Sequence, residues 1–372
     1  MSELVISGWP TIVLAFVSAL AITWYYLPKV LKVVDQKHLN DKPGKRKIHR
    51  REVPTLGGIG IFAGFIFGFL IGINGYMHTV SYFTAAALIL FFVGLKDDLV
   101  NMNPWKKIAA EVAAALIVAL FTNVHFTNFH GFLGITVIPV WLSYFATVFL
   151  IVLIINAVNL IDGIDGLAAS IGIIASIFFG IWFMLSGDFG YTAMSAALLG
   201  SLIVFVFYNM TDGPKKIFMG DTGSLVIGFT LAVMTIRFNE INATDRTFYN
   251  LVSAPSVSIA VLIVPLFDTL RVIILRMRDH QNVFTADNRH MHHMMIRLGL
   301  THRQATFYIS LFNVLLIALA LFLDRIGILL LGVVLLVICI FASYFLTRLV
   351  ARKESDAIHS EKIVNSKEPA TV

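Results

Sequence analysis

The chain has 372 residues and a formal net charge of +6, and 58% of its residues are apolar whereas only 13% are charged. Its mean hydropathy is +0.84, and a water-soluble domain would carry about a quarter charged residues. This composition excludes a soluble globular protein, and the single cysteine, Cys339, excludes a disulfide framework. We predict an all-α polytopic membrane protein.

Apolar stretches of membrane-spanning length recur along the chain, and a transmembrane helix needs roughly 17 to 25 residues. They lie at residues 9–28, 54–73, 79–95, 108–122, 137–156, 166–186, 190–209, 221–237, 256–275, 305–323 and 326–347. We therefore predict about eleven transmembrane helices in a single domain, residues 1–352. Residues 353–372 are polar and show no apolar periodicity, so we predict a disordered tail.

The basic residues indicate the orientation of these spans, because cytoplasmic loops carry an excess of Lys and Arg. With the N-terminus outside, only Arg237, Arg246 and Arg325 of the 28 Lys and Arg residues fall on the outer side. Lys29 and Lys32 follow the first span and no basic residue precedes it, which is the wrong order for a cleaved signal peptide. We predict a cytoplasmic C-terminus. The positive charge is then a topology signal, and nothing else indicates a nucleic-acid partner.

Acid and amide side chains stand where the fifth and sixth spans meet, at Asn156, Asn159, Asp162 and Asp165. Acids at such a position are costly to desolvate and by default mark a functional site. The last three recur every three residues, so on a helix they would converge on one ligand. Capping of the next helix explains one acid but not two acids with two amides. We predict that this stretch binds a metal and phosphates.

Two adjacent acids, Asp97 and Asp98, end the third span, and Lys107 stands directly before the fourth. Such a pair can bind a cation or act as a base, and a lysine can reach a phosphate as a point charge. The alternative is a solvated loop. Asp221 begins the eighth span, where free backbone N–H groups favour anions. Mg²⁺ takes carboxylate and amide oxygens, water and phosphate, although helix capping alone would also explain this acid.

Two polar groups in the C-terminal part of the chain each allow two interpretations. Arg271 and Asp268, three residues apart, either form an intrahelical ion pair or place the arginine on a phosphate. Three histidines, His290, His292 and His293, lack the Cys or carboxylate that a zinc site would need. They therefore indicate partners for a sugar diphosphate, with a solvated basic loop as the alternative.

A basic run at residues 45–51 contains His49 and precedes the sequence Pro-Thr-Leu-Gly-Gly at residues 54–58. A positive run beside the bilayer normally serves topology and anionic lipid. The glycine pair would also permit close approach by a lipid-borne phosphate.

Together these motifs resemble the polyprenyl-phosphate N-acetylhexosamine-1-phosphate transferases, the WecA and TagO branch of the MraY-like glycosyltransferase 4 group. The matching pieces occur in the family's order at residues 54–58, 94–98, 104–107, 156–168, 219–225 and 290–293. The spacing His-x-His-His resembles the WecA and TagO branch rather than the His-His-His run of MraY, which favours UDP-GlcNAc as the donor.

The resemblance implies an enzyme that transfers N-acetylglucosamine 1-phosphate from UDP-GlcNAc to polyprenyl (undecaprenyl) phosphate and releases UMP. It implies Mg²⁺, with Mn²⁺ as a substitute, and a bacterial inner membrane protein, expected as a homodimer, whose active site faces the cytoplasm. The product would initiate lipopolysaccharide or teichoic acid synthesis. Alternatives are a phospho-N-acetylmuramoyl-pentapeptide transferase-like enzyme and a secondary transporter, although transporter sites lie near the midplane between repeated halves.

The resemblance also implies roles for individual residues. Asn159 and Asp221 would hold the metal; Lys107, Arg271, His49, His290, His292 and His293 would bind substrate; Asp97, Asp98, Asp162 and Asp165 form the catalytic set. The second pKa of a phosphate monoester is about 6, so the lipid phosphate is already largely dianionic near pH 7. We therefore expect direct attack by the lipid phosphate, with a covalent aspartyl-phosphate as the rival.

Overall fold

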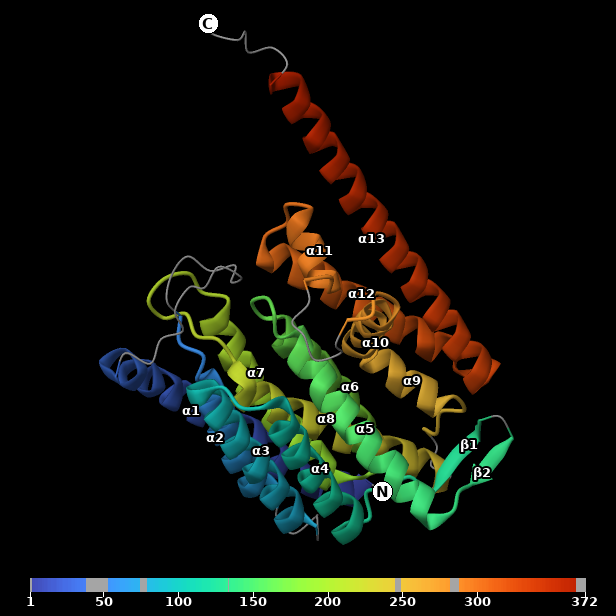
Figure 1. The fold of residues 1–372 in the computed structure, drawn as a ribbon. Helices are drawn as coiled ribbons and strands as arrows, with labels where there is room; N and C mark the ends of the chain where they lie inside the picture. Colours follow the sequence, from blue (N-terminus) through green and yellow to red (C-terminus); the bar gives the residue numbers. More distant parts are fainter. Residues whose placement is uncertain are drawn as a thin grey trace, which may run out of the picture.

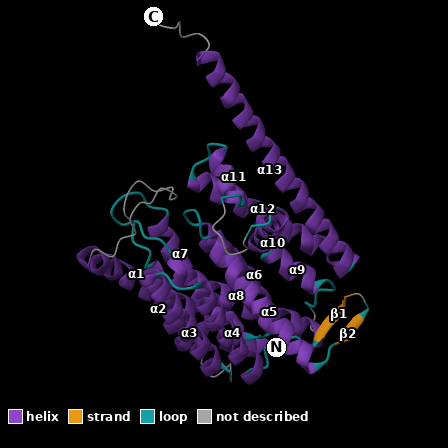
Figure 2. Cartoon of the chain, viewed as in Figure 1, coloured by secondary structure: helices purple, strands orange, loops and turns teal. Residues whose placement is uncertain are grey.

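The computed structural model describes residues 2–37, 53–73, 79–132, 134–244, 249–281 and 288–365. Most of them are helical, and a small two-stranded hairpin is the exception (Figures 1 and 2). The basic run at residues 45–51, which includes His49, lies outside the described residues.

The elements follow the apolar stretches of the sequence. The helices are α1 (Ser2–Lys37), α2 (Gly57–Ile73), α3 (Val80–Val100), α4 (Pro104–Phe121), α5 (Val140–Ile161), α6 (Leu167–Ser186), α7 (Phe189–Asn209), α8 (Gly220–Thr244), α9 (Ala254–Val261), α10 (Ile263–Arg278), α11 (Met291–Arg297), α12 (His302–Phe322) and α13 (Ile328–Asn365). A 3-10 turn, η1 (Asp324–Ile326), precedes α13, and the strands are β1 (Asn128–Phe132) and β2 (Ile135–Val137). Every predicted apolar stretch overlaps a helix, and the ninth is divided between α9 and α10.

Within the described residues, seven helices are long and apolar enough to cross a membrane, namely α1, α5, α6, α7, α8, α12 and α13. Helices α9 and α10 pass the same test only together, and they are bent by 80° at the break between them. These helices confirm a polytopic α-helical membrane protein. The count of eleven spans and their orientation stay predictions.

Helix α8 forms the centre of the bundle and packs against α2, α3, α5 and α6. Its apolar span is 94% buried. A Cβ at Gly228 would lie 2.7 Å from Cα of Ile155, so α8 and α5 approach backbone to backbone, as small residues allow in membranes. This packing brings the end of α5 beside the start of α8.

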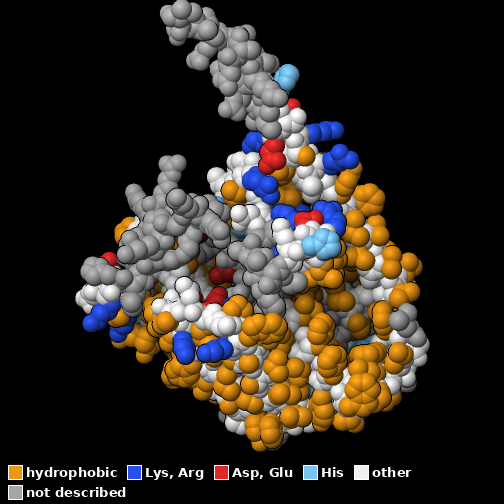
Figure 3. Space-filling model, in the orientation of Figure 1, with side chains coloured by type: hydrophobic (Ala, Val, Ile, Leu, Met, Phe, Trp, Pro, Cys, Tyr) orange, Lys and Arg blue, Asp and Glu red, His pale blue; other side chains and the backbone are white. Residues whose placement is uncertain are grey.

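The two ends of the molecule differ in character. The hairpin lies at the end opposite α11 (Figure 1), and charged side chains gather around α11 and the exit of α13, whereas hydrophobic side chains cover most of the visible surface below them (Figure 3). Helix α13 continues as far as Asn365 and so includes residues 353–365 of the polar segment for which the sequence predicts a disordered tail. Residues 366–372 lie outside the described residues.

Candidate active site

The start of α8 is held by the glycine-containing stretch before α2. The backbone N–H groups of Gly57 and Gly58 donate to the carbonyl oxygens of the two residues before α8, at 2.9 and 2.8 Å. A Cβ at Gly58 would lie 2.2 Å from the backbone nitrogen of Gly223. The close approach that the glycine pair permits is therefore to the protein's own backbone, not to a lipid phosphate as the sequence suggests.

Asp98 also binds the start of α8. Its carboxylate accepts hydrogen bonds from the backbone N–H groups of Asp221 and Thr222 at 2.8 and 2.9 Å, and from Thr222 Oγ1 at 2.5 Å. A Cβ at Gly94 would lie 2.6 Å from Cα of Thr222, so the end of α3 rests directly on this turn. Both oxygens of Asp98 are thus engaged in capping a helix that begins more than a hundred residues later.

Asp221 itself faces residues from three other helices. Asn159 Nδ2, at the end of α5, donates to Asp221 Oδ1 at 2.6 Å and to Ser224 Oγ at 2.8 Å. The ammonium group of Lys107, on α4, contacts the other oxygen of Asp221 and lies 3.4 Å from Asp97 Oδ2. The structure therefore brings Asp97, Lys107, Asn159 and Asp221 together, as the sequence predicts.

Two cavities meet at this group of side chains. The larger, of about 790 Å³, is lined by polar residues from α3, α4, α5, α10 and the start of α11: Asp97, Lys107, Asn156, Asn159, Asp162, Thr269, Arg276, His290, His292 and His293. The smaller, of about 270 Å³, is lined by Thr55, Asp98, Asn159, Asp162, Gly163, Ile164, Asp165, Asn209, Phe218, Met219, Gly220 and Asp221. Asn159, Asp162 and Gly163 line both cavities.

The three predicted histidines lie together on the wall of the larger cavity. Asp268 Oδ2 lies 3.0 Å from His290 Nδ1, and Asp268 Oδ1 accepts from the backbone N–H of Met291 at 3.0 Å. The ring of His292 lies between the other two, with ring centroids 5.5 Å from His290 and 4.2 Å from His293. The structure therefore places the three histidines on one wall of the larger cavity, and Asp268 fixes the orientation of His290. Their role in binding substrate stays a prediction.

His292 is only 1% exposed, and neither ring nitrogen has a hydrogen-bond partner among the described residues. Burial, together with the neighbouring histidines, lowers the pKa of His292 well below its usual value. The ring is therefore neutral at pH 7. A Cβ at Gly163 would lie 2.4 Å from His292 Nε2, so only a glycine at this position leaves room for the ring.

Two predicted site residues have structural partners. Arg271 donates to the carbonyl oxygen of Arg289 at 2.7 Å and lies 3.6 Å from Asp268, and it lines neither of these cavities. Asp165 lines the smaller cavity and pairs with Lys216 Nζ at 2.6 Å and His302 Nδ1 at 3.1 Å. Burial raises the pKa of Asp165, but the hydrogen bonds from His302 and Lys216 outweigh it and leave the pKa below its usual value.

The pKa of Asp162 is shifted in the opposite direction from that of Asp165. Burial and the nearby carboxylates of Asp221, Asp98 and Asp165 raise its pKa well above the usual value. Asp162 is part of the wall that the two cavities share, and the neutral form of its carboxyl is favoured there.

The donor atoms here fit Mg²⁺ better than zinc. Among the described residues, no three His, Cys, Asp or Glu side chains form a group that would hold a metal. Mg²⁺ instead binds through one or two protein oxygens and takes its other ligands from water and substrate phosphates. Asp221 supplies a carboxylate, and Asn159 would supply its Oδ1 after its amide turns, so the two residues fit the ion that the sequence predicts.

Comparison with known proteins identifies the family. Residues 80–239 match the family described as glycosyl transferase family 4. The chain is also 31% identical over 309 residues, 81% of each chain, to a protein of Bacillus subtilis (strain 168) named "Probable undecaprenyl-phosphate N-acetylglucosaminyl 1-phosphate transferase". The chain belongs to glycosyl transferase family 4. This membership confirms the resemblance carried by the motifs.

Two further relatives are similar to this chain over most of their length. The chain is 27% identical over 298 residues, 79% of each chain, to the undecaprenyl-phosphate alpha-N-acetylglucosaminyl 1-phosphate transferase of Escherichia coli O157:H7. It is 30% identical over 285 residues, 75% of each chain, to the Yersinia pestis protein of the same name. The family match begins at α3 and ends within α8, so it includes the helices that carry Asp97, Lys107, Asn159 and Asp221.

Sequence reasoning missed two charged residues near the larger cavity. Arg276 is 4% exposed and lines it, but its position among other basic residues suggests only topology. Glu111 is fully buried and accepts a hydrogen bond from Asn156. It is the only acid in the fourth apolar stretch and stands four residues after Lys107, and an acid at membrane depth is a signal that would have found it.

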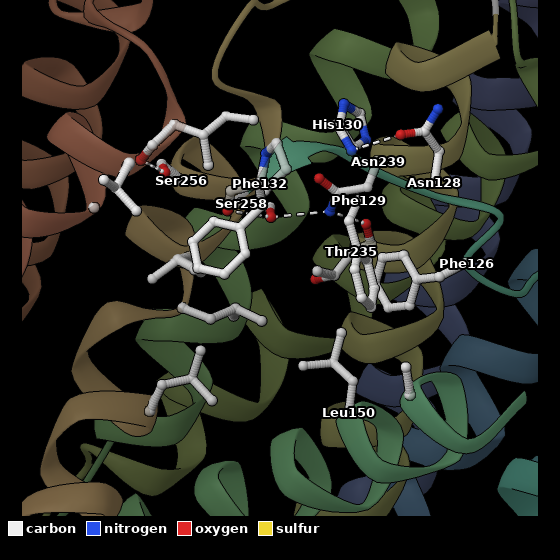
Figure 4. A pocket seen from close by; sticks show the side chains of 18 of the residues that line it. Phe126, Asn128, Phe129, His130, Phe132, Leu150, Thr235, Asn239, Ser256 and Ser258 are labelled. Carbon is white, nitrogen blue, oxygen red and sulfur yellow. Dashed lines mark hydrogen bonds between the residues drawn. The ribbon is translucent and has the colours of Figure 1, made fainter. Parts of the chain in front are cut away.

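A third cavity, of about 580 Å³, lies between the hairpin, α5, α9 and α13 (Figure 4). Its lining is apolar apart from a few groups near the hairpin, where Asn239 Nδ2 donates to Ser258 Oγ at 3.0 Å. Phe149 of α5 lines both this cavity and the larger polar one. An apolar space therefore adjoins the polar site along α5.

Proposed function

We propose that this protein transfers N-acetylglucosamine 1-phosphate from UDP-GlcNAc to polyprenyl phosphate, giving polyprenyl-diphospho-N-acetylglucosamine and UMP. The observation that carries this proposal is the meeting of two polar cavities at Asn159 and Asp162, beside Asp221, with an apolar cavity adjoining the larger one. Two phosphorylated substrates, one of them a lipid, need this arrangement. The names of the related proteins support the same reaction.

We assign the smaller cavity to the nucleotide and the shared wall to the diphosphate. The larger cavity then takes the sugar and the lipid phosphate, where Lys107 and Arg276 supply positive charge. The polyprenyl chain leaves past Phe149, whose ring lines both the polar and the apolar cavity.

The residues around Asp221 position charge rather than form covalent bonds. Bound at Asp221 and Asn159, Mg²⁺ would neutralise the diphosphate. Lys107 lies between Asp97 and Asp221, so its ammonium group is placed to bind the incoming phosphate. Phosphoryl transfer depends mainly on such positioning and electrostatics.

In the proposed reaction, a lipid phosphate oxygen attacks the sugar-bound phosphorus of UDP-GlcNAc. A new P–O bond forms, the P–O bond to the bridging oxygen breaks, and UMP leaves with that oxygen. Because the attacking group is largely dianionic near pH 7, it needs no strong base. Asp98 is engaged by α8, so Asp97 is the aspartate that can position the lipid phosphate or remove a residual proton.

We also propose a bacterial inner membrane location, with eleven spans, the N-terminus outside and the active site facing the cytoplasm. The charge distribution of the loops supports this orientation. The charged surface around α11 agrees with it, and the hairpin at the opposite end would then face outward (Figures 1 and 3).

The test uses purified protein in detergent with labelled UDP-GlcNAc, undecaprenyl phosphate and Mg²⁺, and Asp221→Asn as the control. We expect UMP and a lipid-linked sugar from the wild type, and at least a 100-fold lower rate from the variant, because electrostatic terms of this kind are worth about 3 kcal/mol or more. A parallel reaction with UDP-N-acetylmuramoyl-pentapeptide tests the alternative donor. Absence of both products with every donor would refute the enzyme assignment.

A further inference from the structure

Glu111 is a buried acid that the proposed reaction does not use. Its side chain lies on α4, four residues after Lys107, and is 0% exposed. Oε2 accepts a hydrogen bond from Asn156 Nδ2, while Oε1 is buried without a hydrogen-bond partner among the described residues. Such a group is costly to keep in a membrane protein and indicates a function.

The contacts of Glu111 determine which way the Asn156 amide points. Asn156 Nδ2 donates to Glu111 Oε2 and also to the carbonyl oxygen of Val152, at 2.9 Å. A primary amide has two N–H donors, so both are used. The reverse orientation would place the amide oxygen against a carboxylate and a carbonyl, which are also acceptors. Glu111 therefore fixes the amide orientation.

This orientation leaves an acceptor for the larger cavity. Asn156 lines that cavity, whereas Glu111 lies behind it, and Oδ1 is the only polar atom of the amide that is not already bonded to α4 or α5. The neighbouring Lys107 and Arg276 suit phosphates because they donate and carry positive charge. An acceptor backed by a carboxylate is unsuited to phosphate oxygens. It suits an O–H or N–H donor, and a sugar offers both.

We propose that Glu111 is a positioning residue for sugar recognition, holding Asn156 so that Oδ1 accepts a hydrogen bond from a hydroxyl or the acetamido N–H of the donor sugar. This inference rests on the proposed function, because it takes the larger cavity as the sugar site. A site built to bind a polar hydrogen discriminates strongly against a substrate that lacks it, since its own group is then left unpaired.

The variants Glu111→Gln and Glu111→Leu separate this role from a charge effect on Lys107. Glutamine keeps a carbonyl acceptor for Asn156 Nδ2, whereas leucine removes it. We expect Glu111→Leu to raise the KM for UDP-GlcNAc about tenfold, the equivalent of one hydrogen bond of about 1.4 kcal/mol, with the KM for the lipid unchanged. Glu111→Gln should stay within about threefold of wild type. Equal losses in both variants would overturn the proposal.

A double-mutant cycle tests whether Glu111 acts through Asn156. Asn156→Ala should reproduce the rise in KM, and adding Glu111→Leu to it should change little, because the amide to be oriented is gone. Additive losses would overturn the proposal. The melting curve shows whether Glu111→Leu folds. If it does not fold, Asn156→Ala and Glu111→Gln still test the proposal. A wild-type KM for UDP-GlcNAc in Asn156→Ala would contradict the proposed acceptor.

Competitive binding locates the group that is recognised. The inhibition constant of UDP, which lacks the sugar, should be the same for wild type and Asn156→Ala; an equal weakening of UDP and UDP-GlcNAc would overturn the sugar assignment. Loss confined to UDP-GlcNAc supports the acetamido N–H, and loss shared with UDP-glucose supports a hydroxyl. Direct binding of UDP-GlcNAc by calorimetry gives the same comparison without turnover, so it distinguishes failure of this inference from failure of the transferase assignment.

Discussion

The side-chain amide of Asn159 donates a hydrogen bond of 2.6 Å to Oδ1 of Asp221, joining the end of α5 to the start of α8. The same amide reaches Ser224 Oγ at 2.8 Å. In the proposed metal site, Asn159 would turn its oxygen toward the ion held by Asp221, and the observed contact shows that the two side chains are close enough to reach one ion.

Removing the Asn159 oxygen should therefore remove a metal ligand. We expect Asn159→Ala to lower turnover at least 100-fold and to raise the Mg²⁺ concentration for half-maximal activity, since ligand changes alter both. Ser224→Ala is the matched control, because it removes the other hydrogen bond of the same amide, and it should change turnover less than about threefold. Unchanged activity and Mg²⁺ dependence in Asn159→Ala would refute the assignment.

The two adjacent aspartates of α3 should behave differently. Asp98 accepts three hydrogen bonds from the start of α8, so Asp98→Ala should destabilise the protein by about 1–3 kcal/mol and lower its melting temperature. Asp97 accepts a backbone hydrogen bond only from Met102, in the turn that follows its own helix, among the contacts of the described residues, so Asp97→Ala should lower turnover while the melting curve changes less. A wild-type melting temperature for Asp98→Ala would contradict the capping role.

Gly163 should be intolerant of even one methyl group. Its Cβ would lie 2.4 Å from His292 Nε2, so Gly163→Ala should displace the ring, lower activity and cost about 1–3 kcal/mol through overpacking. Gly332→Ala is the control, because the nearest atom to its Cβ is 3.6 Å away. In a His292→Ala background the cost of Gly163→Ala should largely vanish, and an undiminished cost would show that another contact is responsible.

The ion pairs of Asp165 should stabilise the protein only above an acidic threshold. In the folded state, hydrogen bonds from His302 and Lys216 lower the pKa of Asp165 despite its burial. In the unfolded state, the pKa of an aspartate is about 3.9. The stabilisation is thus complete well above pH 3.9 and is lost as the pH falls through the lowered pKa.

The check is the pH dependence of melting for wild type and Asp165→Asn. The wild type should be the more stable from about pH 5 upward, and the difference should shrink below about pH 4. Asp279→Asn serves as the control, because Asp279 pairs with Arg289 and Arg278 at the surface, where ion pairs contribute little. A stability difference for Asp165→Asn that grows toward low pH would contradict this account.

The sequence predicts the helices and most of the site for identifiable physical reasons. Apolar stretches of membrane-spanning length can be recognised from consecutive residues, and so can an acid such as Asp221 at the end of such a stretch. The partners of those acids are not local: Asp98 binds the start of α8, and Asp165 binds Lys216 and His302. Only the folded chain shows that these aspartates hold helices and loops together.

The partner of Arg271 could not be predicted from the sequence either. A basic residue three positions after Asp268 suggests both a phosphate ligand and an ion pair, and its donation to the carbonyl oxygen of Arg289 depends on where the segment before α11 lies. Glu111 stands in the sequence as an isolated acid within an apolar stretch, which marks it as costly to bury but does not name its partner. Its importance follows from Asn156 on the neighbouring helix.

The measurement that tests the central claim most directly is UMP release by purified enzyme with UDP-GlcNAc and Mg²⁺, with and without undecaprenyl phosphate. Direct transfer at the Asn159–Asp221 wall predicts UMP and lipid-linked sugar in equal amounts when the lipid is present, and no UMP without it. Stoichiometric UMP release in the absence of lipid, at one per enzyme, would contradict direct attack and indicate a covalent aspartyl-phosphate.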